Sequence, residues 1–185
     1  MNIWLTRHTK VNVKPRVCYG QTDVDVAESF LSEAKLIKEQ IGLTHFDKIY
    51  SSPLKRCKKL SEYLFNDEII FDKRLMELNF GDWEMQEWDK ITDSEYQKWM
   101  NDYIETPCLN GESFLDLHLR VSSFIEDLKK ENHENVAIIA HGGSIRSTLT
   151  NIKNEKLEDA FKTNVDYGEI IKLELKNNHT SINSV

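Results

Sequence analysis

The sequence has little proline, glycine or cysteine. Its 185 residues include three prolines and seven glycines, which excludes collagen-like repeats and Pro/Gly-rich low-complexity chains. The three cysteines, Cys18, Cys57 and Cys108, are an odd number without a CxxC pair. Neither a disulfide framework nor a cysteine metal site is therefore indicated. We expect a reducing, cytoplasmic location.

Long apolar runs and an excess of positive charge are also missing. No stretch approaches the ~18 apolar residues of a membrane helix, and the first residues, MNIWLTRH, lack the apolar length of a signal peptide. The net charge of −7 argues against a nucleic-acid-binding surface, which needs a basic stripe. We therefore expect neither nucleic acid nor membrane as a partner, and the sequence predicts no oligomeric state.

The chain is apolar enough to fold, since 39% of its residues are hydrophobic, and its length fits one domain over residues 1–185. The apolar pattern predicts strands at 2–6, 47–50, 68–71, 136–140 and 170–175, the last one more exposed than the others. Helices are expected at 26–41, after the SSP at 51–53 (serine as N-cap, proline as first helical residue), at 114–128 and after 143. This alternation predicts a three-layer α/β/α sandwich with a mostly parallel central sheet.

Polar residues that can bind phosphate follow three of these strands. Arg7 and His8 follow the first strand, Arg56 lies one turn into the helix after the second, and His141 follows the apolar run at 136–140. Parallel sheets bind ligands outside the carboxyl ends of their strands, so we expect these four side chains to meet. Guanidinium groups and helix N-termini both bind phosphoryl oxygens. Each residue alone is ordinarily structural, but their coincidence at one edge predicts a phosphate site.

Four segments resemble the histidine phosphatase superfamily, also called phosphoglycerate mutase-like. They are LTRHT at 5–9, SSPLKRC at 51–57, ELNFGDWE at 77–84 and HGG at 141–143. The resemblance implies a phosphomonoesterase without metal or cofactor that acts on a small phosphorylated metabolite. Two further segments, VCYGQTD at 17–23 and NGESF at 110–114, resemble the α-ribazole phosphatases of that superfamily. They imply α-ribazole 5′-phosphate as the substrate, in cobalamin nucleotide-loop assembly.

The resemblance also implies roles for the four phosphate-binding residues. His8 is the expected nucleophile, which attacks phosphorus and forms a phosphohistidine. Such an imidazole must be neutral at the attacking nitrogen, typically with its other N–H held by a backbone carbonyl. Arg7, Arg56 and a protonated His141 would then hold the phosphoryl oxygens. Three positive charges can stabilise phosphoryl transfer without a metal ion, because catalysis is mainly positioning and electrostatics.

A carboxyl group is needed to protonate the leaving alkoxide and then to activate water. Through the resemblance, Glu77 is our first choice, although three other carboxylates lie in the same stretch, where a solvated face is the ordinary interpretation. Those competing acids are Asp82, Glu84 and Glu87. The candidate substrate-binding residues are Tyr19, Gln21 and Gly142.

Two positions depart from the superfamily pattern. Thr9 stands where a glycine usually follows the histidine, and VKP at 13–15 stands where many relatives have an asparagine that contacts phosphate. We expect Lys14 either to substitute for that contact or to point into solvent. Neither departure removes a catalytic group.

The segment 82–107 is acidic and aromatic. This segment could belong to a lid over the site that spans residues 82–113, with aromatic rings that stack on a base. Alternatively, its aromatic residues belong to ordinary helix packing. Packing is favoured, because such stripes at helical spacing are usually buried. The residues at that spacing are Tyr96, Trp99, Met100 and Tyr103.

Three other functions remain open, and the first is a phosphatase of another sugar or nucleotide phosphate. A phosphoglycerate mutase needs extra basic residues for the second acidic group of its substrate, whereas the segment 82–107 offers only Lys90 and Lys98. Hydrolysis is therefore favoured over transfer. A binding protein that has lost activity could share the fold, since a fold does not establish activity. The complete set of catalytic residue types favours an enzyme.

Overall fold

The computed structural model describes residues 1–176 and 179–184, which include six strands in one sheet. The strands lie in the order β3-β2-β4-β1-β5-β6. The first four of that order are parallel, whereas β5 and β6 are antiparallel to their neighbours. This confirms the predicted α/β fold with a mostly parallel sheet. The strands are β1 (Asn2–Arg7), β2 (Lys48–Ser51), β3 (Ile69–Phe71), β4 (Asn135–Ala140), β5 (Ile170–Lys176) and β6 (His179–Ser184).

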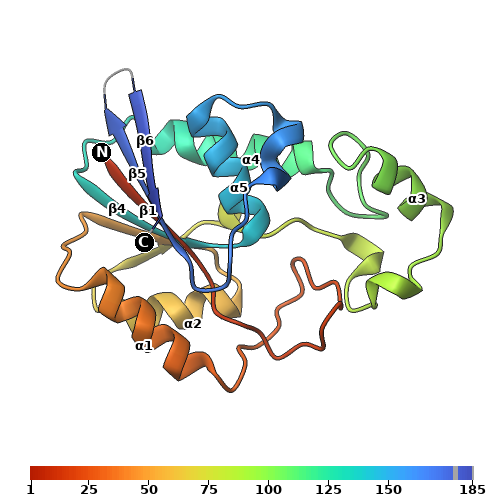
Figure 1. Ribbon diagram of the computed structural model, residues 1–185, viewed down its shortest axis with the longest axis horizontal. Coiled ribbons are helices and arrows are strands. Elements are labelled where there is room, and N and C mark those ends of the chain that lie inside the picture. The colour runs from red at the N-terminus through yellow and green to blue at the C-terminus, as the bar shows by residue number, and fades with distance from the viewer. Residues whose placement is uncertain (177–178, 185) are drawn as a thin grey trace.

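Helices cover both faces of the sheet, as Figure 1 shows. α1 (Phe30–Ile41) and α2 (Lys55–Leu64) lie on one face. α4 (Phe114–Leu128) and α5 (Gly142–Lys153) lie on the other. α3 (Ser94–Asn101) lies far from the sheet, at the right of the view. Short 3₁₀ turns occupy Lys73–Leu75, Gly81–Trp83, Trp88–Lys90 and Leu157–Lys162.

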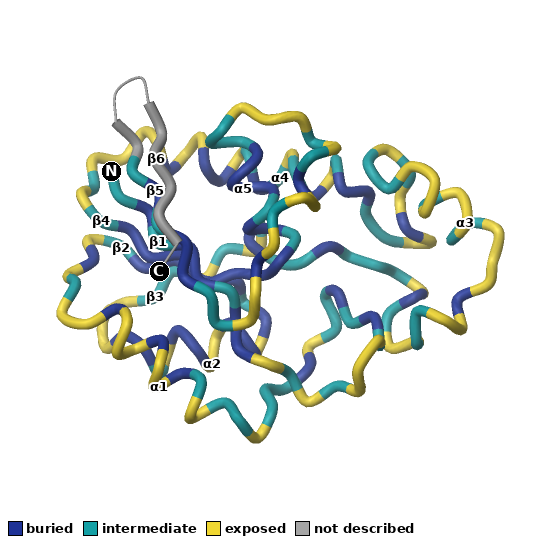
Figure 2. The backbone as a smooth tube through the Cα atoms, in the orientation of Figure 1, coloured by how far each residue is buried: buried dark blue, intermediate teal, exposed yellow. Residues whose placement is uncertain are grey.

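The central strand β4 contributes to both cores. Successive side chains of a strand point to opposite faces, so Ile138 packs with α4 and α5 while Ile139 packs with α1 and α2. Both side chains are buried, and the dark tube in Figure 2 marks the buried strands of the sheet. This explains why residues 136–140 are apolar without alternation.

The strand register brings three chain segments to one edge. Arg7 of β1 is opposite Ala140 of β4, and Ser51 of β2 is opposite Ile139. The strands are parallel, so the residues that follow each of them leave the sheet at the same edge. The predicted convergence of these strand ends is confirmed.

Two predicted helix starts are wrong. The helix expected from residue 26 begins at Phe30, because Val26 forms a β-bridge with Val11 instead. The helix expected after residues 51–53 begins at Lys55, with Leu54 as its N-cap residue. Ser51 belongs to β2, and the Ser52 hydroxyl contacts His141 at 2.7 Å. Neither serine therefore caps the helix.

The last two strands also differ from expectation. β6 was not predicted, and it makes β5 an interior strand between β1 and β6. Ile170, Ile171 and Leu173 of β5 are buried in the cores on the two faces of the sheet. The prediction that this strand is more exposed is therefore wrong.

The aromatic segment packs as a cluster, as favoured from the sequence. Trp83 is buried, and the rings of Trp88 and Trp99 stack with centroids 6.1 Å apart. Tyr96 and Tyr103 pack against the same core, whereas Met100 is exposed and does not. The proposed lid role of residues 82–113 stays a prediction. None of the described helices has the length and hydropathy that a membrane span requires.

Candidate active site

His8 follows β1 directly and is held in one tautomer. Its side chain is 1% exposed, and its Nδ1 lies 2.7 Å from the carbonyl oxygen of Thr9. A carbonyl only accepts, so Nδ1 carries the hydrogen and Nε2 presents its lone pair. Burial, and after it the positive charge of Arg56, lowers the pKa of His8 well below its ordinary value. The imidazole is therefore neutral, with Nε2 able to act as a nucleophile.

Arg56 lies between the two histidine rings. It sits in the first turn of α2 and is fully buried, and its Nε lies 3.3 Å from His8 Nε2 and 3.2 Å from His141 Nδ1. Its two terminal nitrogens donate to the carbonyl oxygens of Gly20 (2.6 Å) and Thr22 (3.1 Å). The guanidinium is thus fixed in orientation by the loop that precedes α1.

His141 follows β4 and faces His8, with ring centroids 5.1 Å apart. Its Nδ1 accepts from Arg56, so Nε2 carries the hydrogen toward the hydroxyl of Ser52 at 2.7 Å. Burial, and after it the charge of Arg56, lowers the pKa of His141 well below its ordinary value. A neutral ring is therefore favoured here, because the side chain is buried and the charges next to it are positive, while a protonated His141 that holds a phosphoryl group stays a prediction.

Arg7, the last residue of β1, has an unused donor. Its Nη1 donates to the carbonyl oxygen of Val165 at 2.6 Å, and its guanidinium lies 3.9 Å from the ring centre of Tyr167. Its Nε is buried without a hydrogen-bond partner. A Cβ on Gly142 would lie 3.5 Å from Arg7 Cζ, so Gly142 adjoins Arg7 at the start of α5.

Glu77 reaches the same helix N-terminus. Both of its carboxylate oxygens lie 3.1 Å from the backbone nitrogen of Gly143, which donates to them. The backbone N–H of Leu78 donates to Oε1 at 2.9 Å. A Cβ at position 143 would lie 2.2 Å from Glu77 Oε1, so this approach requires glycine there.

The three competing carboxylates have other partners. Glu84 accepts from the backbone nitrogens of Gln21 (2.7 Å), Thr22 (2.5 Å) and Phe80 (3.1 Å), so it joins the loop at 20–22 to the turn at 80–84. Two others lie elsewhere, namely Asp82, which accepts from Asn110, and Glu87, which pairs with Lys90. Glu77 is thus the acid of its segment that contacts the start of α5.

Tyr19 and Tyr167 border the two histidines. The Tyr19 ring lies 5.2 Å from Arg56 Cζ, and the Tyr167 ring lies 5.5 Å from the ring of His8. Their hydroxyls are hydrogen-bonded at 2.7 Å. Gln21, the other loop candidate, donates from Nε2 to the backbone oxygen of Glu77 at 2.9 Å. In this state, therefore, Gln21 supports the backbone of the acid.

Sequence reasoning missed Tyr167, Ser52 and Arg120. Arg120, on α4, donates to the backbone oxygen of Glu77 at 2.9 Å and pairs with Glu112. The apolar stripe of its helix gives no local signal for that contact. The only hint of Tyr167 was a tyrosine beside a glycine before β5, which by itself is typical of a turn.

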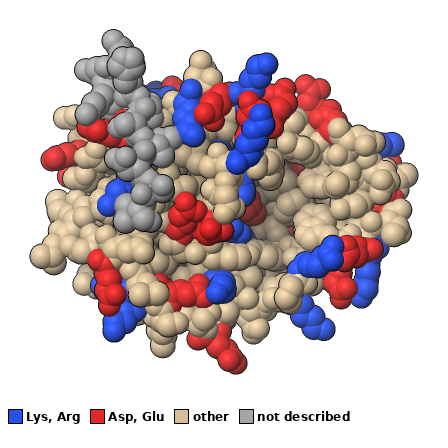
Figure 3. Space-filling model, in the orientation of Figure 1, with Lys and Arg blue, Asp and Glu red and all other residues tan. Residues whose placement is uncertain are grey.

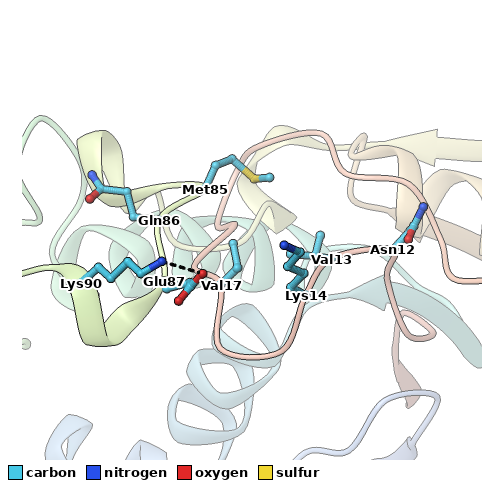
Figure 4. Close-up of a pocket in the computed structure, with 8 residues that line it drawn as sticks. All are labelled: Asn12, Val13, Lys14, Val17, Met85, Gln86, Glu87 and Lys90. Atoms are coloured by element: carbon cyan, nitrogen blue, oxygen red, sulfur yellow. Dashed lines mark ion pairs between the residues drawn. The ribbon is translucent and has the colours of Figure 1, made fainter.

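A basic pocket of about 450 Å³ adjoins the two tyrosines. Lys14 is exposed and lines both this pocket and a neighbouring one of about 490 Å³. Figure 4 shows the second pocket, with Lys14 on the N-terminal loop across from the Glu87–Lys90 ion pair. We define the basic pocket by its lining residues Lys10, Val11, Val13, Lys14, Pro15, Arg16, Val17, Tyr19, Trp88 and Tyr167.

The electrostatics of the site are local. Over the face in Figure 3, basic and acidic side chains of the described residues are interspersed. At the site itself, no carboxylate of the described residues forms an ion pair with Arg7 or Arg56. The described residues also contain no group of three or more His, Cys, Asp or Glu side chains arranged to hold a metal ion. Two guanidiniums, two imidazoles and a helix N-terminus make this a site for an oxyanion.

The fold and this arrangement define an α/β protein with an oxyanion site built around two histidines. The family model of the histidine phosphatase superfamily (branch 1) matches residues 3–185, and the chain belongs to this family. This confirms the family that the four sequence segments resemble.

Relatives of this chain include phosphatases and probable phosphoglycerate mutases. It is 28% identical to phosphoserine phosphatase 1 of Hydrogenobacter thermophilus over 77% of this chain and 72% of that protein. It is 26% identical to the adenosylcobalamin/alpha-ribazole phosphatase of Salmonella typhimurium over 91% of this chain and 87% of that protein. The crystal structure of the alpha-ribazole phosphatase from Shigella flexneri superposes with a TM-score of 0.93 at 22% identity, covering 100% and 96% of the two chains. Family membership and these relatives support a phosphatase.

Proposed function

We propose that this chain is a phosphomonoesterase that needs no metal ion or cofactor and forms a phosphohistidine at His8. The observation that carries the proposal is the buried guanidinium of Arg56, which has no carboxylate partner among the described residues and touches two neutral imidazoles. A buried charge without a counterion is costly, so the site favours a bound anion. The unused Nε of Arg7 adds a donor at the same place.

The proposed reaction has two steps. In the first, Nε2 of His8 attacks phosphorus, the P–N bond forms, and the bond between phosphorus and the alcohol oxygen breaks. Glu77 donates a proton to that oxygen. In the second step, Glu77 takes a proton from water, the water oxygen attacks phosphorus, and the P–N bond breaks to release phosphate. His8 returns neutral.

The cationic groups stabilise both transition states. Arg7 and Arg56 hold the phosphoryl oxygens while negative charge shifts toward the leaving oxygen. A bound phosphoryl dianion raises the pKa of His141 by charge attraction, which favours the cationic form that the sequence predicts. A neutral His141 beside two guanidinium groups and a charged His141 beside a dianion are therefore compatible.

We further propose α-ribazole 5′-phosphate as the substrate, in a reducing cytoplasm, with no nucleic acid or membrane as partner. The segments at 17–23 and 110–114 and the relative in Salmonella typhimurium support this choice. The basic pocket supports it as well, since Tyr19, Trp88 and Tyr167 give it an aromatic lining suited to a flat base.

Turnover of p-nitrophenyl phosphate in excess EDTA, inhibited by vanadate, tests the chemistry. His8→Ala should abolish both turnover and an acid-labile phosphoprotein that accumulates in the wild type. Near-normal rates in this variant would contradict His8 as the nucleophile. A well-folded wild-type protein that binds vanadate but hydrolyses no phosphoester would instead be a binding protein.

A substrate panel tests the finer proposal. It contains α-ribazole 5′-phosphate, phosphoserine, sugar phosphates, nucleotides and phosphoglycerates, compared by kcat/KM. α-Ribazole 5′-phosphate is expected to rank first. Transfer between phosphoglycerates without net release of phosphate would indicate a mutase.

A further inference from the structure

The basic pocket has an unusual charge for this protein. Its ten lining residues include Lys10, Lys14 and Arg16 but no aspartate or glutamate. The whole chain, in contrast, has 31 acidic and 24 basic residues. A concave site lined only by one sign of charge raises the local concentration of the opposite sign. The pocket therefore favours an anionic ligand.

Lys14 is the lining cation that remains without a counterion. Arg16 pairs with Asp89 at 2.5 Å and Lys10 with Glu33 at 3.8 Å, and both carboxylates come from outside the pocket lining. Lys14 has no such pair within the described part of the chain. Its ammonium group is thus available to a ligand.

The pocket is contiguous with the phosphate site through two tyrosines. Tyr19 and Tyr167 line the pocket, and the same rings contact Arg56 and His8 respectively. Apart from Lys10, Lys14 and Arg16, the lining side chains are apolar or aromatic, among them Val13 and Trp88. For a substrate with its phosphoryl group at His8, the way toward Lys14 leads past these two rings, whose hydroxyls are hydrogen-bonded to each other at 2.7 Å.

Resting on the proposed function, we infer that the basic pocket binds the alcohol part of the substrate and that Lys14 pairs with a second anionic group on it. The substrate class then includes flat phosphomonoesters whose far end carries a carboxylate or a phosphate. The base of α-ribazole 5′-phosphate is uncharged. The inference therefore adds a second class of substrates, which would bind against the same aromatic side chains.

A matched pair of esters tests the inference. 4-Carboxyphenyl phosphate and 4-carbamoylphenyl phosphate have nearly the same shape, but only the first carries a second negative charge. The measured quantity is the ratio of their kcat/KM values. The two esters differ in leaving group, but this difference is the same in every variant, so it cancels when the ratio is compared between variants. In Lys14→Met we expect the ratio to fall about fivefold, the upper range for an exposed ion pair. Lys14→Arg should retain the wild-type ratio.

Lys35→Met is the charge-matched control. Lys35 lies on α1, pairs with Glu39 and does not line the pocket, so its loss changes net charge equally and should leave the ratio at the wild-type value. Addition of 0.5 M salt should lower the ratio in the wild type but not in Lys14→Met, because salt screens exposed charges.

The outcomes separate the two proposals. If both esters are hydrolysed and the ratio of their kcat/KM values is the same in the wild type and in Lys14→Met, the inference is overturned but the proposed function stands. An equal fall in Lys35→Met also overturns it, since the effect would then be one of net charge. If wild-type protein hydrolyses neither ester nor p-nitrophenyl phosphate, the proposed function fails and the inference with it.

Discussion

The two buried histidines of the site should make the stability of the fold depend on pH near neutrality. Burial first, and the charge of Arg56 second, lowers the pKa of His8 and of His141 well below 6.5. An unfolded chain titrates its histidines near 6.5. Below that pH the unfolded state takes up a proton at each position and the folded state does not. Stability is therefore fully present above about pH 6.5 and is lost as the pH falls below it.

The size of the loss follows from this proton uptake. Each histidine that stays neutral in the fold costs about 1.4 kcal/mol of unfolding free energy between pH 7.5 and 5.5. His8 and His141 together therefore cost about 2.8 kcal/mol over that range. Aspartates with lowered pKa values, such as Asp72 and Asp116, titrate below this window and do not contribute.

Urea unfolding at pH 7.5, 6.5 and 5.5 measures the effect. In His8→Gln and in His141→Gln, the loss between pH 7.5 and 5.5 should shrink by about 1.4 kcal/mol each. His45→Gln is the control, because it removes an exposed histidine outside the site. Burial also lowers the pKa of His118, but this residue is present in all four proteins and cancels. The same pH dependence in all four would refute the assignment of two neutral histidines.

Three substitutions test the arrangement around Glu77. Glu77→Gln should slow alkyl phosphates by about 10²-fold or more but p-nitrophenyl phosphate far less, since that leaving group scarcely needs a proton; equal losses would contradict its role as the acid. In Gly143→Ala the new Cβ would lie 2.2 Å from Glu77 Oε1, so this variant should also lose more activity on alkyl phosphates than on p-nitrophenyl phosphate while vanadate still inhibits it. Wild-type rates would show that the contact is dispensable. Glu84→Gln should lower the unfolding free energy in urea by about 2–3 kcal/mol, because the N–H groups of Gln21 and Thr22 donate to different oxygens of Glu84 and the new amide nitrogen must face one of them; no loss would mean that the loop is held otherwise.

The fold and the main phosphate-binding residues could be predicted because both follow from local patterns. An apolar run such as 136–140 indicates a buried parallel strand, and parallel strands end at one edge. The residue types after those ends, Arg7, His8 and His141, are therefore brought together by topology alone. The structure places His8 and His141 within contact of Arg56, as that reasoning requires.

What the sequence could not predict depends on distant contacts. Tyr167 meets Tyr19, which lies 148 positions earlier, and no local pattern pairs them. The start of α2 was misplaced because Ser52 contacts His141, 89 positions away, rather than the helix. The lowered pKa of His141 was missed because it is set first by burial and then by the positive charge of Arg56, both of which only the packed structure defines.

The chain as a whole has a negative net charge, whereas the phosphate site is positively charged. The chain carries a net charge of −7, yet no described carboxylate pairs with Arg7 or Arg56. The acids nearest the site are instead bound to backbone N–H groups, as Glu77 is to Gly143 and Glu84 is to the loop at 20–22. The nearby acids thus hold the backbone in place while leaving both guanidiniums unneutralised. Their charge is then available to the phosphoryl group, whose recognition depends on these few positions and not on the net charge of the chain.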